Sequence, residues 1–277
     1  MRILLRRHGS LISYFILALL LILTLFPIFI MLTISLKSYN QYTVNPLLPS
    51  LPLHWENYRI AWDVMARHYL NNVIIIGVST VASLFLGSLT AYALARYDFP
   101  GRQIIFYAVL AVMAIPGAVI LVPSFMVIVQ LGVLNTLWAL ILPYTAHQSL
   151  AIFVFTTFFS TLPEEMFEAA RLDGAGYLDI YSRLIIPLSL PIIGAMGIFQ
   201  VWWHWNDYVW PSLVLSKPAL RTVAQALVQF SDALLSAHPE PGHSMAASVL
   251  ASVPLVLLFL FSMRTFIAGM TAGAVKM

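Results

Sequence analysis

The chain contains no cysteine and few charged residues, and each shortage excludes a class of protein. With no cysteine among 277 residues, disulfides, thiolate metal sites and cysteine nucleophiles are excluded. Charged residues make up 9% of the chain, whereas an ordinary soluble domain carries about 25%. The hydrophobic share is 61% and the mean hydropathy is +0.89. The composition is that of a membrane protein, and with a net charge of only +3 we expect contact with membrane lipid and none with nucleic acid.

Long apolar runs predict six membrane-spanning helices at roughly twenty residues per span. Four runs each fit one helix: residues 11–34, 70–94, 185–209 and 244–262. Residues 103–159 contain no Lys, Arg, Asp or Glu, and this run is long enough for two more spans with a break near 132–135. The predicted fold class is therefore all-α, a polytopic membrane protein with both termini on one side.

Lysine and arginine are distributed unequally between the two sides of this topology. Of the 14 such residues, nine fall on the side that carries the termini: Arg2, Arg6, Arg7, Arg96, Arg102, Arg171, Arg183, Arg264 and Lys276. Positive residues mark the cytoplasmic side, so both termini are predicted to be cytoplasmic. A cleaved signal peptide is the alternative, but the first apolar run is too long and no small-x-small cleavage site follows it.

The two long connections on the opposite side are predicted to be external loops. Residues 35–69 contain a polar and aromatic stretch beginning at His54, for which a solvated connector is the simplest interpretation. Residues 210–243 are rich in proline, and loops of this length are usually functional or disordered. No internal repeat is detected, so one membrane domain accounts for the chain.

A charged segment, residues 160–187, lies between the fourth and fifth predicted spans. Ser160 or Thr161 can cap a helix whose first turn contains Glu164 and Glu165, because acids are favoured at the positive end of a helix. The side chains of Ala169 and Ala170 are small, so another protein could approach this helix closely.

An elbow and a second short helix are predicted to follow within the 160–187 segment. Asp173-Gly174 breaks the first helix, because glycine adopts positive φ at low cost. Tyr177, Ile180 and Tyr181 then begin an amphipathic stripe at helical spacing. The residues alone are compatible with a hairpin resting on lipid headgroups or with a docking element for a cytosolic partner.

The 160–187 segment resembles the EAA loop of permease subunits of bacterial ABC importers. The family pattern is Glu-Ala-Ala, three residues, Gly, nine residues and a hydrophobic pair ending in Pro. Here the matching residues are Glu168, Ala169, Ala170, Gly174, Leu184, Ile186 and Pro187. Asp173-Gly174-Ala175, the stretch 205–211 and the tail 269–276 are similar to the second permease subunit of maltose-type transporters.

This resemblance implies the type I ABC importer permease fold, with the following organisation: cytoplasmic N-terminus 1–10, first helix 11–34, external loop 35–69, permease core 70–264 with five helices, and cytoplasmic tail 265–277. It also implies that the 160–187 segment couples the permease to an ATPase. The residues expected to do so are Glu168, Ala169, Ala170, Asp173, Gly174, Ala175 and Pro187. Glu168 would pair with a cation on the ATPase, and Gly174 would be the elbow.

The resemblance further implies a transport subunit rather than an enzyme. The chain has no Walker A pattern, so ATP and Mg are expected on the partner ATPase and no cofactor on this chain. The expected assembly is a heterodimer with a second permease, two ATPase subunits and an extracytoplasmic sugar-binding protein in a bacterial inner membrane. It would import a sugar or related polyol by alternating access.

A cluster of aromatic and polar residues near the end of the fifth predicted span is chemically suited to line a sugar pathway. It contains Trp203, His204, Asn206 and Asp207, and His147 lies inside the fourth span. Aromatic faces stack on sugar rings, and amide and imidazole groups bond hydroxyls. The competing interpretation is that Trp and Tyr collect at membrane interfaces in any case and that His147 is a hydrogen-bonded core residue.

Two other functional classes fit the sequence less well. An intramembrane enzyme could use Ser149 near His147, but neither a Gly-x-Ser-x-Gly elbow nor a His-Glu-x-x-His zinc site is present. His204 and Asp207 could hold a metal, yet no third ligand accompanies them, so no metal site is expected. A secondary transporter would favour inverted repeats, and none is detected. The EAA-type segment has no role in an intramembrane enzyme or in a secondary transporter.

Overall fold

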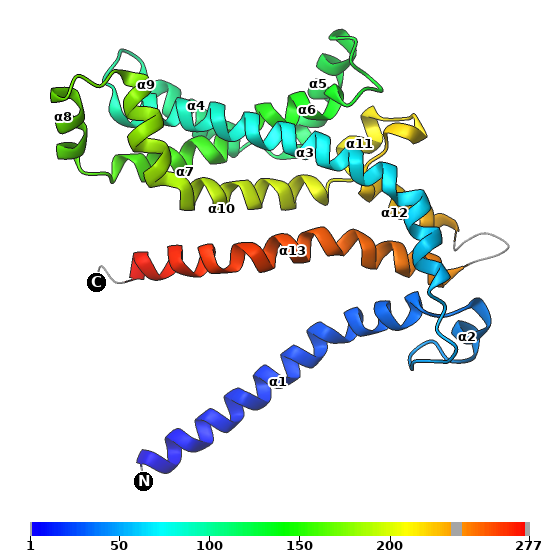
Figure 1. Cartoon of the computed structure of the whole chain (residues 1–277). Helices are drawn as coiled ribbons and strands as arrows, with labels where there is room; N and C mark the ends of the chain where they lie inside the picture. The colour runs from blue at the N-terminus through cyan, green and yellow to red at the C-terminus, as the bar shows by residue number, and fades with distance from the viewer. Residues whose placement is uncertain (1, 234–239, 275–277) are drawn as a thin grey trace. The chain divides into compact units, whose positions relative to one another are not determined.

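The computed structural model describes the backbone of residues 2–233 and 240–274 and the side chains of residues 13–229 and 240–263. Within these residues every regular element is a helix (Figure 1). The predicted all-α class is therefore confirmed. The predicted termini 1–10 and 265–277, the family-like tail 269–276 and the tip of the loop 210–243 lie wholly or partly outside the described residues.

Five helical segments in the described chain are long and apolar enough to cross a membrane. They are Ser13–Ser35 in α1 (Arg2–Ser35), all of α3 (Glu56–Arg96), Trp138–Ser160 with α6 (Trp138–Ala146) and α7 (Ser149–Ser160), Tyr177–Trp205 with α10 (Ile186–Trp205), and Pro241–Met263 in α13 (Pro241–Ala274). A sixth span is formed if the bent pair α4 (Arg102–Met113) and α5 (Gly117–Gln130) is counted as one. The number of predicted spans agrees with this second count.

The bend between α4 and α5 was not predicted from the sequence. The two helices meet at an angle of 103°. Pro116 is the N-cap residue of α5, with extended backbone at φ −58° and ψ 132°. Proline has no N–H to continue α4, and it disfavours helical backbone at the residue before it. The apolar run is therefore continuous in hydropathy but interrupted in backbone structure.

The predicted break at residues 132–135 is confirmed by two left-handed residues. Gly132 has φ 68° and Asn135 has φ 58°. Asparagine tolerates this conformation better than most residues. The Asn135 Oδ1 atom accepts hydrogen bonds from the backbone nitrogen atoms of Ser216 and Lys217 at 2.6 and 3.2 Å. The break between α5 and α6 is thus held by a connection from later in the chain.

Several helices extend beyond the apolar runs that predicted them. The second span was expected from residue 70, yet α3 begins at Glu56. The predicted external loops also contain helices: α2 (Tyr39–Val44), α11 (Val209–Val214), a 3₁₀ turn (Pro218–Leu220) and α12 (Val223–Ala233). Hydropathy marks the part of a helix that suits lipid and does not detect its polar continuation. Ala61 and Met65, at i and i+4 in that continuation of α3, are fully buried.

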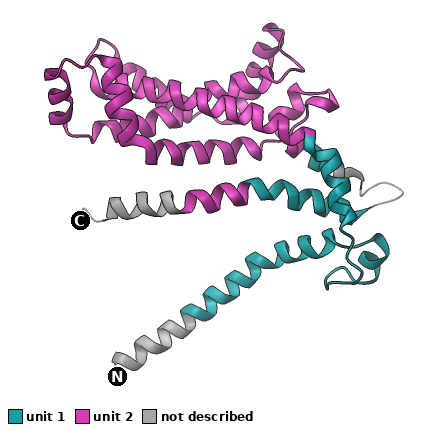
Figure 2. Ribbon diagram, in the orientation of Figure 1, with its two compact units in different colours: residues 1–66, 226–254 teal, residues 67–225, 255–277 magenta. Residues whose placement is uncertain are grey.

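The chain divides into two compact units, coloured in Figure 2. Unit 1 contains residues 1–66 and 226–254, and unit 2 contains residues 67–225 and 255–277. In unit 1 the buried Asn57 amide donates to the carbonyl oxygens of Ser35 and Lys37 at 3.0 and 2.9 Å. These bonds satisfy backbone groups left unpaired where α1 ends.

Unit 2 contains two separate hydrophobic clusters. The first joins α3, α7, α10 and the 160–187 segment, with Phe155, Phe159, Phe167 and Ile185 fully buried. The second joins α5, α6 and α11 around Leu140 and Val214. Phe106 of α4 also stacks on Phe153 of α7, with ring centroids 6.4 Å apart. The first cluster is the one that supports the charged segment.

The packing of Gly242 in unit 1 gives a prediction about stability. A Cβ atom added at Gly242 would clash with the Lys37 carbonyl oxygen and the Asn57 amide, whereas one added at Gly77 would meet no atom within 4 Å. We expect Gly242→Ala to destabilise the protein by roughly 1–3 kcal/mol through overpacking. Gly77→Ala, the matched control in α3, should leave stability unchanged or raise it. Thermal melting of both variants in detergent tests this, and equal melting temperatures would contradict it.

Candidate functional site

The first helix of the 160–187 segment is α8 (Glu164–Leu172), and it begins later than predicted. Ser160 and Thr161 do not cap it. Their hydroxyl groups donate instead to the carbonyl oxygens of Thr156 and Phe158, at 2.8 and 2.7 Å, and so complete the end of α7. Pro163 is the N-cap residue of α8. Because proline favours extended backbone at the preceding residue, the chain straightens before the new helix starts.

The predicted elbow at Gly174 is confirmed. Gly174 has φ 82°, a conformation that glycine adopts without steric cost. The Ala175 nitrogen donates to the Ala170 carbonyl at 2.9 Å, and the Gly174 nitrogen donates to the Arg171 carbonyl at 3.0 Å. These two bonds form a Schellman motif, the common glycine-dependent end of a helix.

The predicted second short helix is wrong as a separate element. Helix α9 (Tyr177–Ile180) continues through a π-helical turn, Tyr181–Ile185, into α10. The Ile186 nitrogen bonds the Tyr181 carbonyl across this turn, immediately before Pro187. A proline ring clashes with the carbonyl four residues earlier in a regular helix, and a wider turn relieves such crowding. The segment therefore joins the fifth span without a break.

Arg96, the last residue of α3, holds α8 in place. Its guanidinium donates to the Glu164 carboxylate at 2.8 Å and to the carbonyl oxygens of Phe159 and Leu162 at 2.6 and 2.5 Å. It also lies 3.9 Å from the centre of the Phe167 ring. The Arg96 side chain is only 7% exposed. One cation thus connects the end of α3, the end of α7 and the first turns of α8.

Tyrosine residues attach the other side of the elbow to α3. The Tyr181 hydroxyl lies 2.7 Å from the Ser88 hydroxyl, and the Tyr92 and Tyr97 hydroxyl groups are hydrogen-bonded to each other. The rings of Tyr97 and Tyr177 meet edge to face with centroids 5.1 Å apart. Both arms of the elbow are consequently fixed to the same end of α3, and Figure 1 shows α8 and α9 beside each other there.

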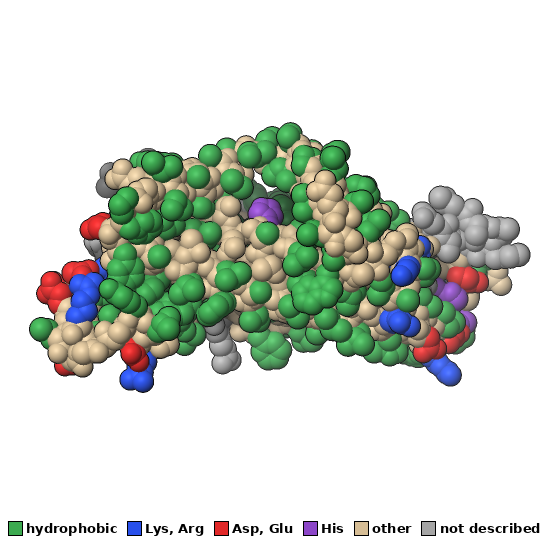
Figure 3. All heavy atoms as spheres, turned by 90° about the horizontal axis from the view of Figure 1, so that it is seen from above, with side chains coloured by type: hydrophobic (Ala, Val, Ile, Leu, Met, Phe, Trp, Pro, Cys, Tyr) green, Lys and Arg blue, Asp and Glu red, His purple; other side chains and the backbone are tan. Residues whose placement is uncertain are grey.

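The sequence-predicted coupling residues divide between the surface and the interior. Glu168, Ala169, Asp173, Gly174 and Pro187 are exposed, whereas Ala170 and Ala175 are half-buried against the first cluster. On the face shown in Figure 3, acidic and basic side chains gather on the side where α8 lies in Figure 1.

Two features of the 160–187 segment and its surroundings were not predicted from the sequence. The first is the anchoring role of Arg96 and Phe167, which depends on contacts between residues far apart in the chain. Three large apolar side chains beside the elbow are exposed: Leu172 at 89%, Tyr177 at 72% and Leu178 at 72%. Apolar groups exposed around a well-anchored polar helix mark a surface suited to a protein partner.

The predicted pathway residues are only partly brought together. His147, Trp203 and His204 line one pocket of about 150 Å³, with Leu150, Ala151, Met196, Phe199 and Gln200. Asn206 lies outside it and donates to the Trp202 carbonyl at 2.7 Å. Asp207 also lies outside and accepts a hydrogen bond from the Tyr144 hydroxyl at 2.7 Å. Gln200, the first residue of the aromatic and polar stretch 200–207, lines the pocket as well.

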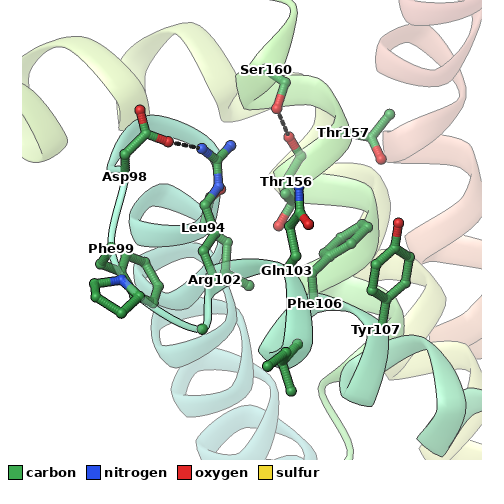
Figure 4. A pocket seen from close by; sticks show the side chains of 13 residues that line it. Leu94, Asp98, Phe99, Arg102, Gln103, Phe106, Tyr107, Thr156, Thr157 and Ser160 are labelled. Atoms are coloured by element: carbon green, nitrogen blue, oxygen red, sulfur yellow. Dashed lines mark hydrogen bonds and ion pairs between the residues drawn. The ribbon is translucent and has the colours of Figure 1, made fainter.

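A larger pocket of about 900 Å³ lies beside the ends of α3 and α7 and contains none of the predicted site residues (Figure 4). Arg102 at its edge is paired with Asp98 at 2.5 Å and donates to the Leu94 carbonyl at 2.6 Å. This cation is therefore occupied in closing the end of α3. Among the described residues no group of three His, Cys, Asp or Glu side chains could hold a metal ion.

Comparison with known proteins places the chain in a family. Residues 83–271 match the family described as the binding-protein-dependent transport system inner membrane component. The inner membrane ABC transporter permease protein YcjP of Escherichia coli is 36% identical over 94% of this chain and 94% of its own. The melibiose/raffinose/stachyose import permease protein MelC of Bacillus subtilis is 33% identical over 90% of this chain and 91% of its own.

The fold is also found among solved structures. One chain in the crystal structure of a bacterial ABC transporter that imports the acidic polysaccharide alginate superposes with a TM-score of 0.83, at 22% identity, covering 93% of this chain and 96% of that one. The chain described here therefore belongs to the family of binding-protein-dependent transport inner-membrane components, the permease subunits of carbohydrate-type ABC importers.

Proposed function

We propose that this permease moves a sugar or related polyol inward by alternating access, driven by ATP hydrolysis on partner subunits. The observation that supports this most directly is the construction of α8. Its inner side is anchored by Arg96 and Phe167, while Glu168 and Ala169 on the same short helix are exposed. A rigidly held helix with an exposed outer face can transmit a displacement applied by a partner.

The partner that fits this surface is an ATPase subunit. Glu168 would form an ion pair with a cation of that subunit, and the exposed apolar groups beside the elbow would be covered by it. Such a surface combines an apolar contact with a charge that sets orientation. The ATPase would bind ATP and Mg, and this chain would transmit the resulting movement to α3 and α10.

The remaining partners are proposed from the family. They are a second permease, two ATPase subunits in all and an extracytoplasmic binding protein. A related bacterial alginate ABC transporter, similar in fold with a TM-score of 0.67, has been solved in complex with a pentasaccharide-bound periplasmic protein. The loop after the fifth span, residues 211–243, would face the binding protein, although its tip lies outside the described residues.

The names of several relatives support the proposed class of substrate. MelC is a melibiose, raffinose and stachyose import permease, AraQ of Bacillus subtilis belongs to an arabinooligosaccharide transport system, and NgcG of Streptomyces coelicolor belongs to a diacetylchitobiose uptake system. We propose a saccharide as cargo. The location would be a bacterial inner membrane, with both termini and the 160–187 segment in the cytoplasm.

Charge reversal at Glu168 tests the coupling role. We expect Glu168→Lys to lower uptake and co-purification of the ATPase by roughly tenfold or more, because a lost interfacial charge pair costs several kcal/mol. Asp63→Lys is the control, a charge reversal at an exposed acid of α3 outside the 160–187 segment, and it should leave co-purification unchanged.

Gly174→Pro tests the elbow. It should abolish uptake without loss of membrane insertion, because proline cannot adopt the positive φ at this position. Normal uptake in both segment variants would refute the coupling role.

Loss of Arg96 should loosen α8 rather than unfold the chain. We expect Arg96→Gln to expose the α8 backbone, so that trypsin cleaves after Arg171 at least several-fold faster than in the parent protein while uptake falls. Hydrogen bonds to a charged group contribute about 1.5–3 kcal/mol each, and Arg96 makes three. Arg183→Gln removes a more exposed cation, whose pair with Asp179 is 3.5 Å long, and should change neither measurement. Unchanged cleavage after Arg171 in Arg96→Gln would show that α8 is held in another way.

A further inference from the structure

The loop that follows α1 is closed on itself at the level where the first membrane span ends. The candidate span in α1 runs to Ser35, and the His54 nitrogen donates to the Leu36 carbonyl at 2.9 Å. Residues 36–54, called here the 36–54 loop, therefore begin and end directly after the span. The Ser35 hydroxyl also lies 2.7 Å from the Tyr58 hydroxyl near the start of α3. Both ends of the loop are thus held at the membrane end of α1, where Figure 1 shows α2.

The surface of the 36–54 loop carries no ionised acid or base over most of its length. Residues 38–55 contain no Lys, Arg, Asp or Glu. The cation just before them, Lys37, is only 1% exposed, and its ammonium group donates to the Asn45 carbonyl within the loop. The first acid after them is Glu56, whose carboxylate is paired with the His54 ring at 2.5 Å. Residues 38–53 therefore present no charge to their surroundings.

Large apolar side chains project from the second half of this loop, residues 44–53, which form the loop tip. Val44 is 86% exposed, Leu51 is 83% exposed and Leu48 is 61% exposed. Leu47 and Leu53 are exposed as well, at 51% and 39%. Apolar side chains concentrated in this way mark a surface that lipid or another protein covers, because their exposure to water is unfavourable.

Aromatic residues stand at the two ends of the loop. Tyr39, the first residue of α2, is 41% exposed, and Trp55, directly after the loop, is 64% exposed. The Trp55 ring lies 6.0 Å from the Tyr58 ring, measured between centroids. Tryptophan and tyrosine are enriched where a protein crosses the boundary between water and lipid, because their rings are apolar and their N–H and O–H groups are polar. Their positions suit a loop whose ends lie at that boundary.

The backbone of the loop tip has few donors that need an outside partner. Three of its residues are proline, which has no N–H. The Asn45 nitrogen is bonded within the loop, and the Asn45 Oδ1 atom accepts hydrogen bonds from the Leu47 and Leu48 nitrogen atoms at 3.2 and 3.1 Å. Backbone groups that enter lipid must be satisfied internally, because lipid chains offer no hydrogen bonds. The construction of the tip lowers this cost.

The composition of the loop tip favours lipid over a protein partner. Residues that dominate protein interfaces are enriched in Trp, Tyr and Arg, whereas leucine and valine are under-represented, and complementary charges give such interfaces their specificity. The tip has four leucines and one valine and no charged residue. Its base also begins at the residue after a membrane span, so lipid already surrounds the preceding helix end.

We propose that the loop tip, residues 44–53, inserts its leucine side chains into the lipid leaflet that the C-terminal end of α1 reaches. In the proposed topology this is the outer leaflet. The loop lies in the headgroup region without crossing the membrane, as interfacial segments do, and it fixes the depth of the end of α1. This inference concerns attachment to the membrane and is independent of the cargo and of ATP.

The test measures which solvent surrounds the loop tip in the complete importer, in proteoliposomes with cysteine-free partner subunits. The chain has no cysteine, so Leu51→Cys can carry a single fluorophore, and at 83% exposure the change should not disturb folding. Asp63→Cys, at an exposed acid of α3, is the control. A lipid with a nitroxide near the headgroup end of its chain should quench the Leu51→Cys label several-fold more strongly than the Asp63→Cys label. Aqueous iodide should show the opposite order.

Three results would overturn the proposal. Strong quenching of the Leu51→Cys label by iodide and little by the nitroxide lipid would show that the tip is a solvated connector. Protection from both quenchers would show that another subunit, such as the second permease, covers it. Quenching by iodide that disappears only when the binding protein is added would show that the tip is a docking surface for that protein. Quenching by the nitroxide lipid with and without the binding protein supports insertion.

Discussion

The Arg96 guanidinium joins the ends of α3 and α7 to the start of α8, and the arrangement of the 160–187 segment depends on it. In a chain with 9% charged residues, this cation is 7% exposed and donates to one carboxylate and two carbonyl oxygens. The two carbonyls belong to Phe159, in the last turn of α7, and Leu162, in the connection to α8. Replacing Arg96 therefore affects α3, α7 and α8 together.

The two arms of the elbow are connected to the membrane-spanning part in different ways. The α8 arm reaches it through the contacts of its Glu164 and Phe167 side chains with Arg96 of α3, whereas the α9 arm continues without a break through the π-helical turn into α10. Gly174 lies between them in the left-handed conformation. A displacement of α8 would therefore act on α3 through contacts and on α10 through the backbone. This double connection gives a physical basis for one short surface helix moving two spans.

The sequence was sufficient for features that depend on local chemistry. Uncharged runs located the spans and the break near 132–135, and Gly174 marked a position that needs positive φ. It was insufficient where distant residues decide the outcome. Arg96 and Glu164 are 68 positions apart, and no local pattern pairs them. The same holds for the pocket: His147, Trp203 and His204 were identified by residue type, whereas Asp207 is bonded to Tyr144, 63 positions away, and lies outside it.

The central claim is that the exposed face of α8 is seated on an ATPase subunit. Site-directed cross-linking tests it most directly, because the natural chain has no cysteine. Ala169→Cys is exposed on α8 and would carry a photoactivated cross-linker in membranes that contain the whole importer. The account predicts a covalent adduct with the ATPase subunit whose yield changes between nucleotide-free and ATP-bound states. A reactive Ala169→Cys that forms no adduct with the ATPase in either state would contradict it.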